Sequence, residues 1–151
     1  MYINKYDKDR RGCMKFLADG DEYVYTKFEP YGAHKVFPCF DQPDIKASMK
    51  ISVVAPADWI VASNEPSVSA ESFHVHKYRT YLELEHSSSI KMLDKFTNHQ
   101  RIGNNTKMTL FGRSKVISTY LFVFAAGPYT CIDAPYNSGS VPMRIYSARS
   151  S

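Results

Sequence analysis

The residues of this chain that could carry out chemistry are first of all its histidines. A zinc peptidase needs the pattern H-E-x-x-H on a helix, because two imidazoles four residues apart bind the metal and the glutamate acts as the base. No two of the five histidines show this spacing with a glutamate between them: His34, His74, His76, His86 and His99. The G-x-S-x-G, P-loop and dinucleotide-binding patterns are also absent. The sequence therefore predicts no catalytic residue and no metal site in this chain.

One pair of histidines merits separate consideration. His74 and His76 fall on the same face of a strand-like segment and could hold a metal together with a third ligand. Two ligands do not close a zinc site, however. We therefore favour the interpretation that they are surface histidines on an exposed strand.

The cysteines are three in number and widely spaced. Cys13, Cys39 and Cys131 form no C-x-x-C pair, and the polar, charged start of the chain lacks the apolar core of a secretion signal. Disulfides are rare without secretion, so we expect three reduced thiols in or near the core. This favours a cytoplasmic location. No apolar run approaches the roughly 20 residues that span a membrane, so we expect no membrane association.

Length and composition predict one globular domain. The chain has 151 residues, of which 44% are hydrophobic and 23% charged, and its net charge is +4. A chain of this size can bury roughly 70% of its unfolded surface. The composition excludes a disordered tail or a disulfide-framed mini-protein, and the charge is too small and too evenly spread to indicate nucleic acid as a partner.

The pattern of elements that must position these residues is all-β. Alternating or β-rich segments lie at 23–26, 48–55, 74–84, 107–111, 119–126 and 141–146. In 48–55 the alternation places Met49, Ile51 and Val53 on one face. The segment 119–126 is apolar on both faces, which is typical of a central strand covered on both sides. Helical patterns are limited to 90–96 and one turn within 31–37.

One long motif points to a family. Residues 26–47 read T-K-F-E-P-Y-G-A-H-K-V-F-P-C-F-D-Q-P-D-I-K-A. This closely resembles the amino-terminal β domain of the aminopeptidase N family of zinc metallopeptidases, whose pattern is roughly T-Q-F-E-P-x-D-A-R-R-x-F-P-C-F-D-E/Q-P-x-x-K-A. Trp59 with A-S-N-E-P at 62–66, and I-S-T-Y-L-F at 117–122 with A-G-P-Y at 126–129, resemble further family motifs in the right order. The resemblance covers most of 3–148.

The resemblance implies the fold and the domain organisation. It implies a saddle-like β-sheet or sandwich with at most one or two short helices, which packs on a zinc-containing catalytic domain. We interpret 1–151 as a single partial domain, incomplete at its amino-terminal end, and 68–105 as a surface-loop insertion. The family's G-x-M-E-N and H-E-x-x-H motifs do not occur here. We therefore expect a fragment that is inactive alone and binds no zinc, whereas the intact parent would hold zinc and remove amino-terminal residues from peptides.

The F-P-C-F-D-Q-P run is interpreted as structural. Its residues are Phe37, Pro38, Cys39, Phe40, Asp41, Gln42 and Pro43. Each proline fixes φ and interrupts a strand ladder, so the run should be a short, irregular buried segment. We expect Phe37 and Phe40 to lie in the core and Asp41 to be a buried or half-buried carboxylate that accepts hydrogen bonds from backbone donors.

Glu29 is the one residue to which the resemblance assigns a chemical role. The matching family position reaches into the active-site cleft and holds the free α-amino group of the substrate. Lys27 stands where many members have Gln, shares a face with Glu29 on an extended chain, and could compete with the substrate through an ion pair. His34-Lys35 replace Arg-Arg and Gly32 replaces a common Asp, which predicts a less rigid loop around Glu29 because Arg is a permanent bidentate donor.

Two other functions remain open at this point. The chain could be a stand-alone β module that binds peptides or a partner protein, or a decayed gene product without function. Under the family interpretation its partners are the missing catalytic domain of the same polypeptide and the peptide substrate.

Overall fold

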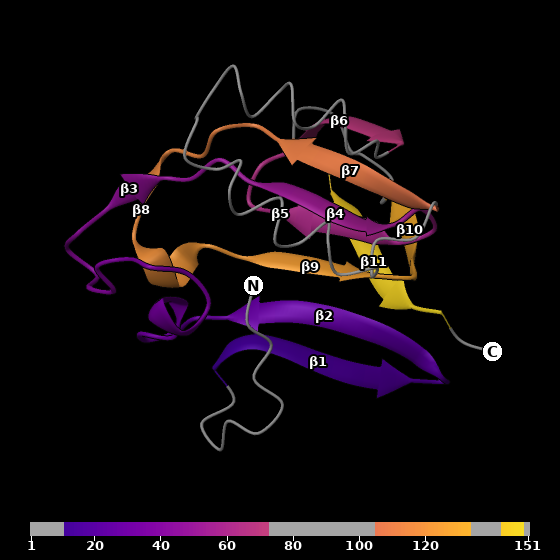
Figure 1. Cartoon of the computed structure of the whole chain (residues 1–151), viewed down its shortest axis with the longest axis horizontal. Helices are drawn as coiled ribbons and strands as arrows, with labels where there is room; N and C mark the ends of the chain where they lie inside the picture. Colours follow the sequence, from indigo (N-terminus) through magenta and orange to yellow (C-terminus); the bar gives the residue numbers. More distant parts are fainter. Residues whose placement is uncertain (1–10, 73–104, 134–142, 150–151) are drawn as a thin grey trace, which may run out of the picture.

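The computed structural model describes residues 11–72, 105–133 and 143–149, and the elements within them are strands and two short 3₁₀ turns (Figure 1). The predicted all-β class is confirmed. The predicted strand 74–84, the predicted helix 90–96, and His74 and His76 lie outside the described residues. So does most of the predicted insertion 68–105, whose first residues continue a strand up to Ser72.

The largest sheet has four antiparallel strands in the order β1-β2-β9-β5. They are β1 (Gly12–Ala18), β2 (Asp21–Lys27), β9 (Phe124–Gly127) and β5 (Ile60–Ser63). β1 and β2 form a hairpin around Asp19-Gly20, where φ is positive at both residues, +49° and +85°. A two-residue turn of this kind matches the twist of the paired strands and favours glycine. The predicted strand at 23–26 is confirmed as part of β2.

A second sheet packs against the first and has the order β4-β7-β6. Its strands are β4 (Ser52–Pro56), β7 (Thr106–Phe111) and β6 (Ser67–Ser72). The two sheets share a core of four buried side chains, two from each sheet: Ala55, Phe111, Val61 and Ala126. Ala55, Val61 and Phe111 are next to more exposed residues along their strands, so the apolar faces of both sheets meet between them.

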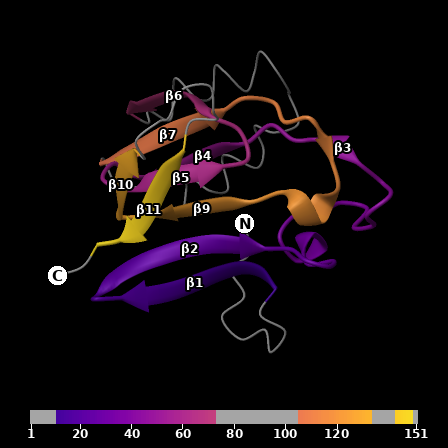
Figure 2. The same cartoon turned by 180° about the vertical axis from the view of Figure 1, so that it is seen from behind.

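Two small sheets complete the described structure. One joins β3 (Ala47–Ser48) to β8 (Val116–Ile117), and the other joins β10 (Tyr129–Asp133) to β11 (Arg144–Ala148). The β10–β11 hairpin lies beside the main sheet at the end opposite β3 and β8 (Figure 2). Tyr23 joins this hairpin to the main sheet. The ring centroids of Tyr23 and Tyr129 are 4.9 Å apart, and the Tyr23 hydroxyl accepts a hydrogen bond from the Arg149 N–H.

The prediction of one strand over 119–126 was partly wrong. The first residues form the 3₁₀ turn η2 (Thr119–Leu121), and only Phe124 onward is strand. The side chain of Asn64 provides the reason, because it bonds the Leu121 carbonyl and the Val123 N–H, both at 2.9 Å, where a neighbouring strand would otherwise pair. The central position was correct, since β9 pairs with β2 on one side and β5 on the other.

The prediction of a continuous strand over 48–55 also needs correction. The chain leaves β3 at Ser48 and enters β4 at Ser52, so it passes from one sheet to another between them. The predicted apolar face is nevertheless correct, because Met49, Ile51 and Val53 all pack against the buried core clusters. The periodicity thus identified the inward face but could not identify the change of sheet.

Candidate functional site

Glu29 lies two positions after the last residue of β2, on the segment that leads to η1 (Ala33–Lys35). The turns η1 and η2 lie at the same end of the molecule (Figure 1). Its side chain is exposed, and the Glu29–Pro30 peptide bond is cis. Lys27 is exposed as well, and the described residues include no ion pair between Lys27 and Glu29. The carboxylate is therefore accessible to a ligand from solvent.

Two fully buried residues hold the segment that carries Glu29. Phe28 is 2% exposed and Ala33 is 0% exposed, and both belong to one core cluster with Phe122. The Gly32 N–H donates to the Phe28 carbonyl at 2.6 Å and closes the loop between them. A Cβ at Gly32 would lie 3.1 Å from the Lys27 carbonyl oxygen and 3.1 Å from the Cβ of Arg11, so the close fit favours glycine there. Glu29 thus stands on a short loop with both ends fixed.

Three aromatic rings pack together next to the Glu29 loop. Phe37 meets Phe28 and Phe122 edge-on at 5.8 and 5.9 Å, and the rings of Phe28 and Phe122 stack at 6.2 Å. Edge-to-face and offset arrangements at such distances are favourable beyond the area they bury. Since Phe37 belongs to the F-P-C-F-D-Q-P run and Phe122 follows η2, three distant parts of the chain meet beneath Glu29.

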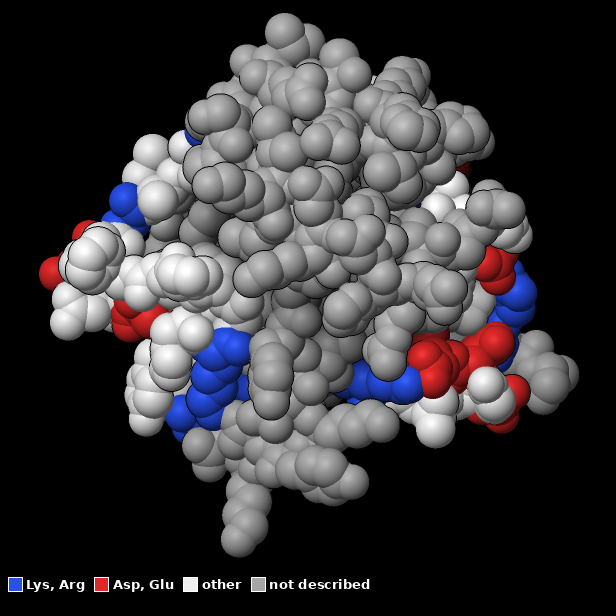
Figure 3. Space-filling model, viewed as in Figure 1, with Lys and Arg blue, Asp and Glu red and all other residues white. Residues whose placement is uncertain are grey.

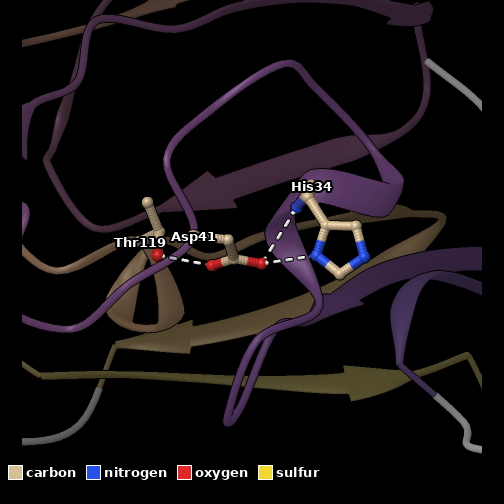
Figure 4. A network of polar contacts seen from close by, with 3 residues as sticks. All are labelled: His34, Asp41 and Thr119. Atoms are coloured by element: carbon tan, nitrogen blue, oxygen red, sulfur yellow. Dashed lines mark hydrogen bonds and ion pairs between the residues drawn. The ribbon is translucent and has the colours of Figure 1, made fainter.

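A polar network joins the same parts of the chain (Figure 4). The Asp41 side chain is 7% exposed. One of its oxygens accepts from the Thr119 hydroxyl at 2.6 Å, and the other accepts from the His34 N–H at 3.1 Å and from the His34 Nδ1–H at 2.9 Å. The prediction that Asp41 is a buried or half-buried carboxylate that accepts from a backbone donor is confirmed.

The protonation state of Asp41 follows from these contacts. Burial raises the pKa of the carboxyl group, but the hydrogen bonds from Thr119 and His34, together with the nearby imidazole, outweigh burial and lower it below its usual value. Asp41 is therefore ionised at neutral pH and can only accept hydrogen bonds. It follows that His34 carries a proton on Nδ1, whether the ring is neutral or charged.

The outer face of His34 carries a stack of side chains. The His34 ring lies nearly parallel to that of Tyr31, with centroids 6.5 Å apart, and the guanidinium of Arg11 lies 5.0 Å from the centroid of Tyr31. The cation–π contact links the start of β1 to the Glu29 loop. Arg11 and Thr119 were not predicted as parts of this site, whereas His34 was named only as a replacement in the loop around Glu29. Thr119 lies 78 residues from Asp41 in the sequence.

Phe40 is a correction to the sequence-based expectation. It was predicted to lie in the core, but its side chain is 77% exposed. The cause is the local backbone: the Gln42 N–H bonds the Phe40 carbonyl at 2.9 Å, and Asp41 turns inward to Thr119, so Phe40 points the other way. Phe37 is partly buried, as are Cys39 and Asp41, whereas Pro38, Gln42 and Pro43 are exposed. The Pro43 carbonyl accepts a hydrogen bond from Ser118 at 2.5 Å.

The three cysteines are free, but their environments differ. Cys13 is buried, and burial raises the pKa of its thiol to about 11. Cys39 is partly buried, and burial together with the Asp41 carboxylate also raises its pKa. Cys131 is exposed, so the prediction that all three lie in or near the core was wrong for this residue, which lies in the middle of β10.

The described surface offers no further ligand set. Within residues 11–72, 105–133 and 143–149, no group of three or more His, Cys, Asp or Glu side chains is placed to hold a metal ion. None of these segments forms a helix with the length and hydropathy needed to cross a membrane. On the described rim of the face in Figure 3, basic and acidic side chains lie interspersed.

Comparison with known proteins agrees with this architecture. The chain matches the family described as peptidase M1 N-terminal domain over residues 2–92. It is 31% identical to glutamyl aminopeptidase of Mus musculus over 133 residues, which are 87% of this chain and 11% of that protein. It is 41% identical to aminopeptidase N of Streptomyces lividans over 64 residues, 41% of the chain and 8% of the relative.

A third relative extends the match over nearly the whole chain. A probable M1 family aminopeptidase 2 of Encephalitozoon cuniculi is 29% identical over 146 residues, which are 96% of this chain and 13% of the relative. The chain therefore spans about a tenth of the length of these relatives. The family match covers more than half of the chain, and it includes the Glu29 loop, His34 and Asp41, whereas Thr119 lies beyond it. This chain belongs to the family of peptidase M1 N-terminal domains.

Proposed function

We propose that this domain works beside a zinc-dependent catalytic domain of an aminopeptidase, where Glu29 binds the free α-amino group of the peptide substrate. An exopeptidase must recognise an ammonium group, and a carboxylate does so through a charge-assisted hydrogen bond. Fixing the ammonium also fixes which peptide bond reaches the metal. The zinc and the residues that hydrolyse the peptide belong, in this proposal, to the catalytic domain.

The observation that carries the proposal is the placement of Glu29. Its carboxylate is exposed, yet the backbone on both sides is fixed by Phe28 and Ala33. An exposed acid on a flexible loop would lose conformational entropy when it binds, whereas a fixed loop has lost most of it already. The exposed side chain of Phe40 supports the proposal of a neighbouring domain, because a large aromatic ring on the surface can be buried by contact with that domain.

The location of the protein is part of the same proposal. Cys13, Cys39 and Cys131 are all free thiols, which is compatible with a reducing compartment. We therefore propose a cytoplasmic enzyme, in which the catalytic domain and the peptide substrate are the partners of this domain.

A chimeric enzyme tests the role of Glu29. This chain replaces the aligned 133-residue segment of mouse glutamyl aminopeptidase, and hydrolysis of an aminoacyl reporter is measured. We expect Glu29→Ala to lower kcat/KM on the order of 10- to 150-fold, because one charge-assisted hydrogen bond is lost. Glu22→Ala is the matched control, because Glu22 is an exposed acid at the other end of β2 that pairs with Lys15.

The result can contradict the proposal in two ways. Equal effects of Glu29→Ala and Glu22→Ala would show that Glu29 has no special role. Unfolding of the Glu29→Ala chimera with unchanged activity per folded molecule would show a structural role instead.

Because Lys27 forms no ion pair with Glu29 within the described residues, we expect Lys27→Gln to change kcat/KM by less than about fivefold.

A further inference from the structure

We propose that His34 is a positioning residue: through Asp41 it holds the Glu29 loop in place, and it does so more firmly when its imidazole is protonated. The proposal rests on the proposed function of Glu29 for its biological meaning. The device itself concerns only residues of this chain, so it can be tested without substrate.

The first step of the argument is the path of contacts. The Glu29 loop runs from Phe28 to Ala33, and His34 is the next residue. Asp41 binds His34 with one oxygen and Thr119 with the other, so the first residues of η1 and η2 are held together (Figure 4).

The second step closes this path back to the start of the loop. β9 follows η2, and β9 is bonded to β2 through Thr26, whose hydroxyl accepts from the Phe124 N–H at 2.9 Å. The loop and the network therefore form a closed circuit of contacts. His34 contributes two of the three hydrogen bonds that Asp41 accepts from the described residues. Of these two, only the ring contact depends on the identity of the side chain.

The third step is the chemistry of the ring contact. A neutral imidazole with a proton on Nδ1 gives the Asp41 carboxylate one hydrogen bond. A protonated imidazole gives the same bond with charge assistance, and such bonds are roughly twice as strong. The histidine therefore makes the strength of the contact depend on pH.

Among the described residues, few groups face His34. Asp41 contacts the edge of the ring at Nδ1, and the ring of Tyr31 stacks on its face. Behind Tyr31 is the guanidinium of Arg11, and Lys35 is the next residue on η1. Cys39 lies near Asp41, whose carboxylate acts on its thiol. Among these groups, the imidazole is the one that contacts the Asp41 carboxylate directly.

The experiment uses the full 151-residue chain in NMR. The ring signals of His34 and the amide signals of Glu29 and of 31–33 are followed from pH 5 to 8, and hydrogen exchange at the Gly32 amide is corrected for its intrinsic pH dependence. We expect the loop amides to shift with the same midpoint as the His34 ring, and the protection of Gly32 to fall about tenfold as the ring loses its charge. Amides of the β4–β7 ladder report global stability and should not change.

Three variants separate positioning from folding. His34→Gln should lower the protection of Gly32 by about tenfold at low pH and remove the pH step. His34→Arg should keep the protection at all pH values, which is the rescue expected of a positioning role. Asp41→Asn should abolish the step. Asp44→Asn is the matched control, because Asp44 is an exposed acid three residues away, and it should behave as the unchanged chain.

Two results would overturn the proposal. One is a Gly32 amide that is equally protected in the unchanged chain and in His34→Gln at low pH. The other is an equal loss of protection at Gly32 and in the β4–β7 ladder, because His34 would then stabilise the fold as a whole. Neither result bears on the kinetic test of Glu29, so the two proposals can fail separately.

Discussion

At the scale of single residues, Asp41 shows how a charge can be kept inside a small β domain. The hydrogen bonds from Thr119 and His34, together with the nearby imidazole, outweigh the cost of burial and lower the pKa of the carboxyl group. A carboxyl group whose pKa is lower in the folded state stabilises the fold fully above its unfolded pKa, here 3.8, and loses this contribution as the pH falls through the folded pKa.

This gives an acid-stability prediction. We expect the free energy of unfolding to decrease as the pH drops below about 3.8, and Asp41→Asn to remove this part of the pH dependence. Urea denaturation at a series of pH values measures it. Asp44→Asn serves again as the control. If the free energy of unfolding of Asp41→Asn still decreases below about pH 3.8 as in the unchanged chain, other carboxylates cause the effect.

The two phenylalanines of the motif region allow a direct test of packing. Phe28 is 2% exposed and Phe40 is 77% exposed. Phe28→Ala should lower the free energy of unfolding by about 3–5 kcal/mol, because it leaves a cavity under the Glu29 loop. Phe40→Ala should change it by less than about 0.5 kcal/mol. Chemical denaturation of both variants decides, and equal losses would mean that Phe40 is buried in solution.

The thiols provide a test at high pH. Burial raises the pKa of Cys13 to about 11 from 9.0, so the folded state keeps a proton that the unfolded state has lost between these values. The protonated Cys13 thiol contributes fully to the free energy of unfolding below pH 9. This contribution, on the order of 2–3 kcal/mol, is lost as the pH rises through 11. Cys13→Ala should flatten this decline of the free energy of unfolding at high pH.

In an alkylation assay at pH 8, Cys131 should react at least tenfold faster than Cys13. Similar rates would contradict the burial of Cys13.

At the scale of elements, the joint between β2 and β9 determines where the Glu29 loop stands. Only Val24 and Tyr25 pair with β9 in the regular ladder. Beyond them, the Thr26 hydroxyl forms the hydrogen bonds to β9. It accepts from the Phe124 N–H at 2.9 Å and donates to the Phe124 carbonyl at 3.3 Å. A side chain thus replaces the backbone partner at the point where the two strands separate.

Replacing this hydroxyl tests the joint. Thr26→Val keeps the shape of the side chain but leaves the buried Phe124 N–H without its partner, which should cost about 1–3 kcal/mol. We also expect faster hydrogen exchange at the Phe124 amide. Thr130→Val on exposed β10 is the control and should be close to neutral. If both variants are equally stable, another donor or acceptor satisfies Phe124.

At the scale of the whole molecule, the two larger sheets share one core. Ala55 and Phe111 come from one sheet, and Val61 and Ala126 come from the other. Trp59 packs against this cluster and also against the cluster of Cys13, Val24 and Phe124. Since the clusters have neighbours in common, the described domain should unfold in one transition.

The purified chain provides the test at this scale. We expect it to hydrolyse no aminoacyl reporter and to bind no stoichiometric zinc, because the sequence lacks H-E-x-x-H and the described residues form no metal-binding cluster. Metal analysis and a reporter assay check this. One tightly bound zinc per chain, together with hydrolysis, would contradict both the prediction and the division of roles in the proposed function.

Some features of this protein could be predicted from the sequence alone. The alternation of apolar residues identified the all-β class, the strand before Glu29 and the inward face of Met49, Ile51 and Val53, because a strand buries every second side chain whatever its partners. The long motif at 26–47 identified the family, because its residues occur in one continuous stretch.

Other features were decided only by the tertiary structure. Whether Phe37 or Phe40 turns inward, where strand gives way to η2 before β9, and which donors reach Asp41 all depend on contacts between distant segments. Asn64 bonds Leu121 across 57 residues and Thr119 bonds Asp41 across 78. Such contacts leave no local period in the sequence, because each partner is an ordinary polar residue until the fold brings the other within hydrogen-bond distance.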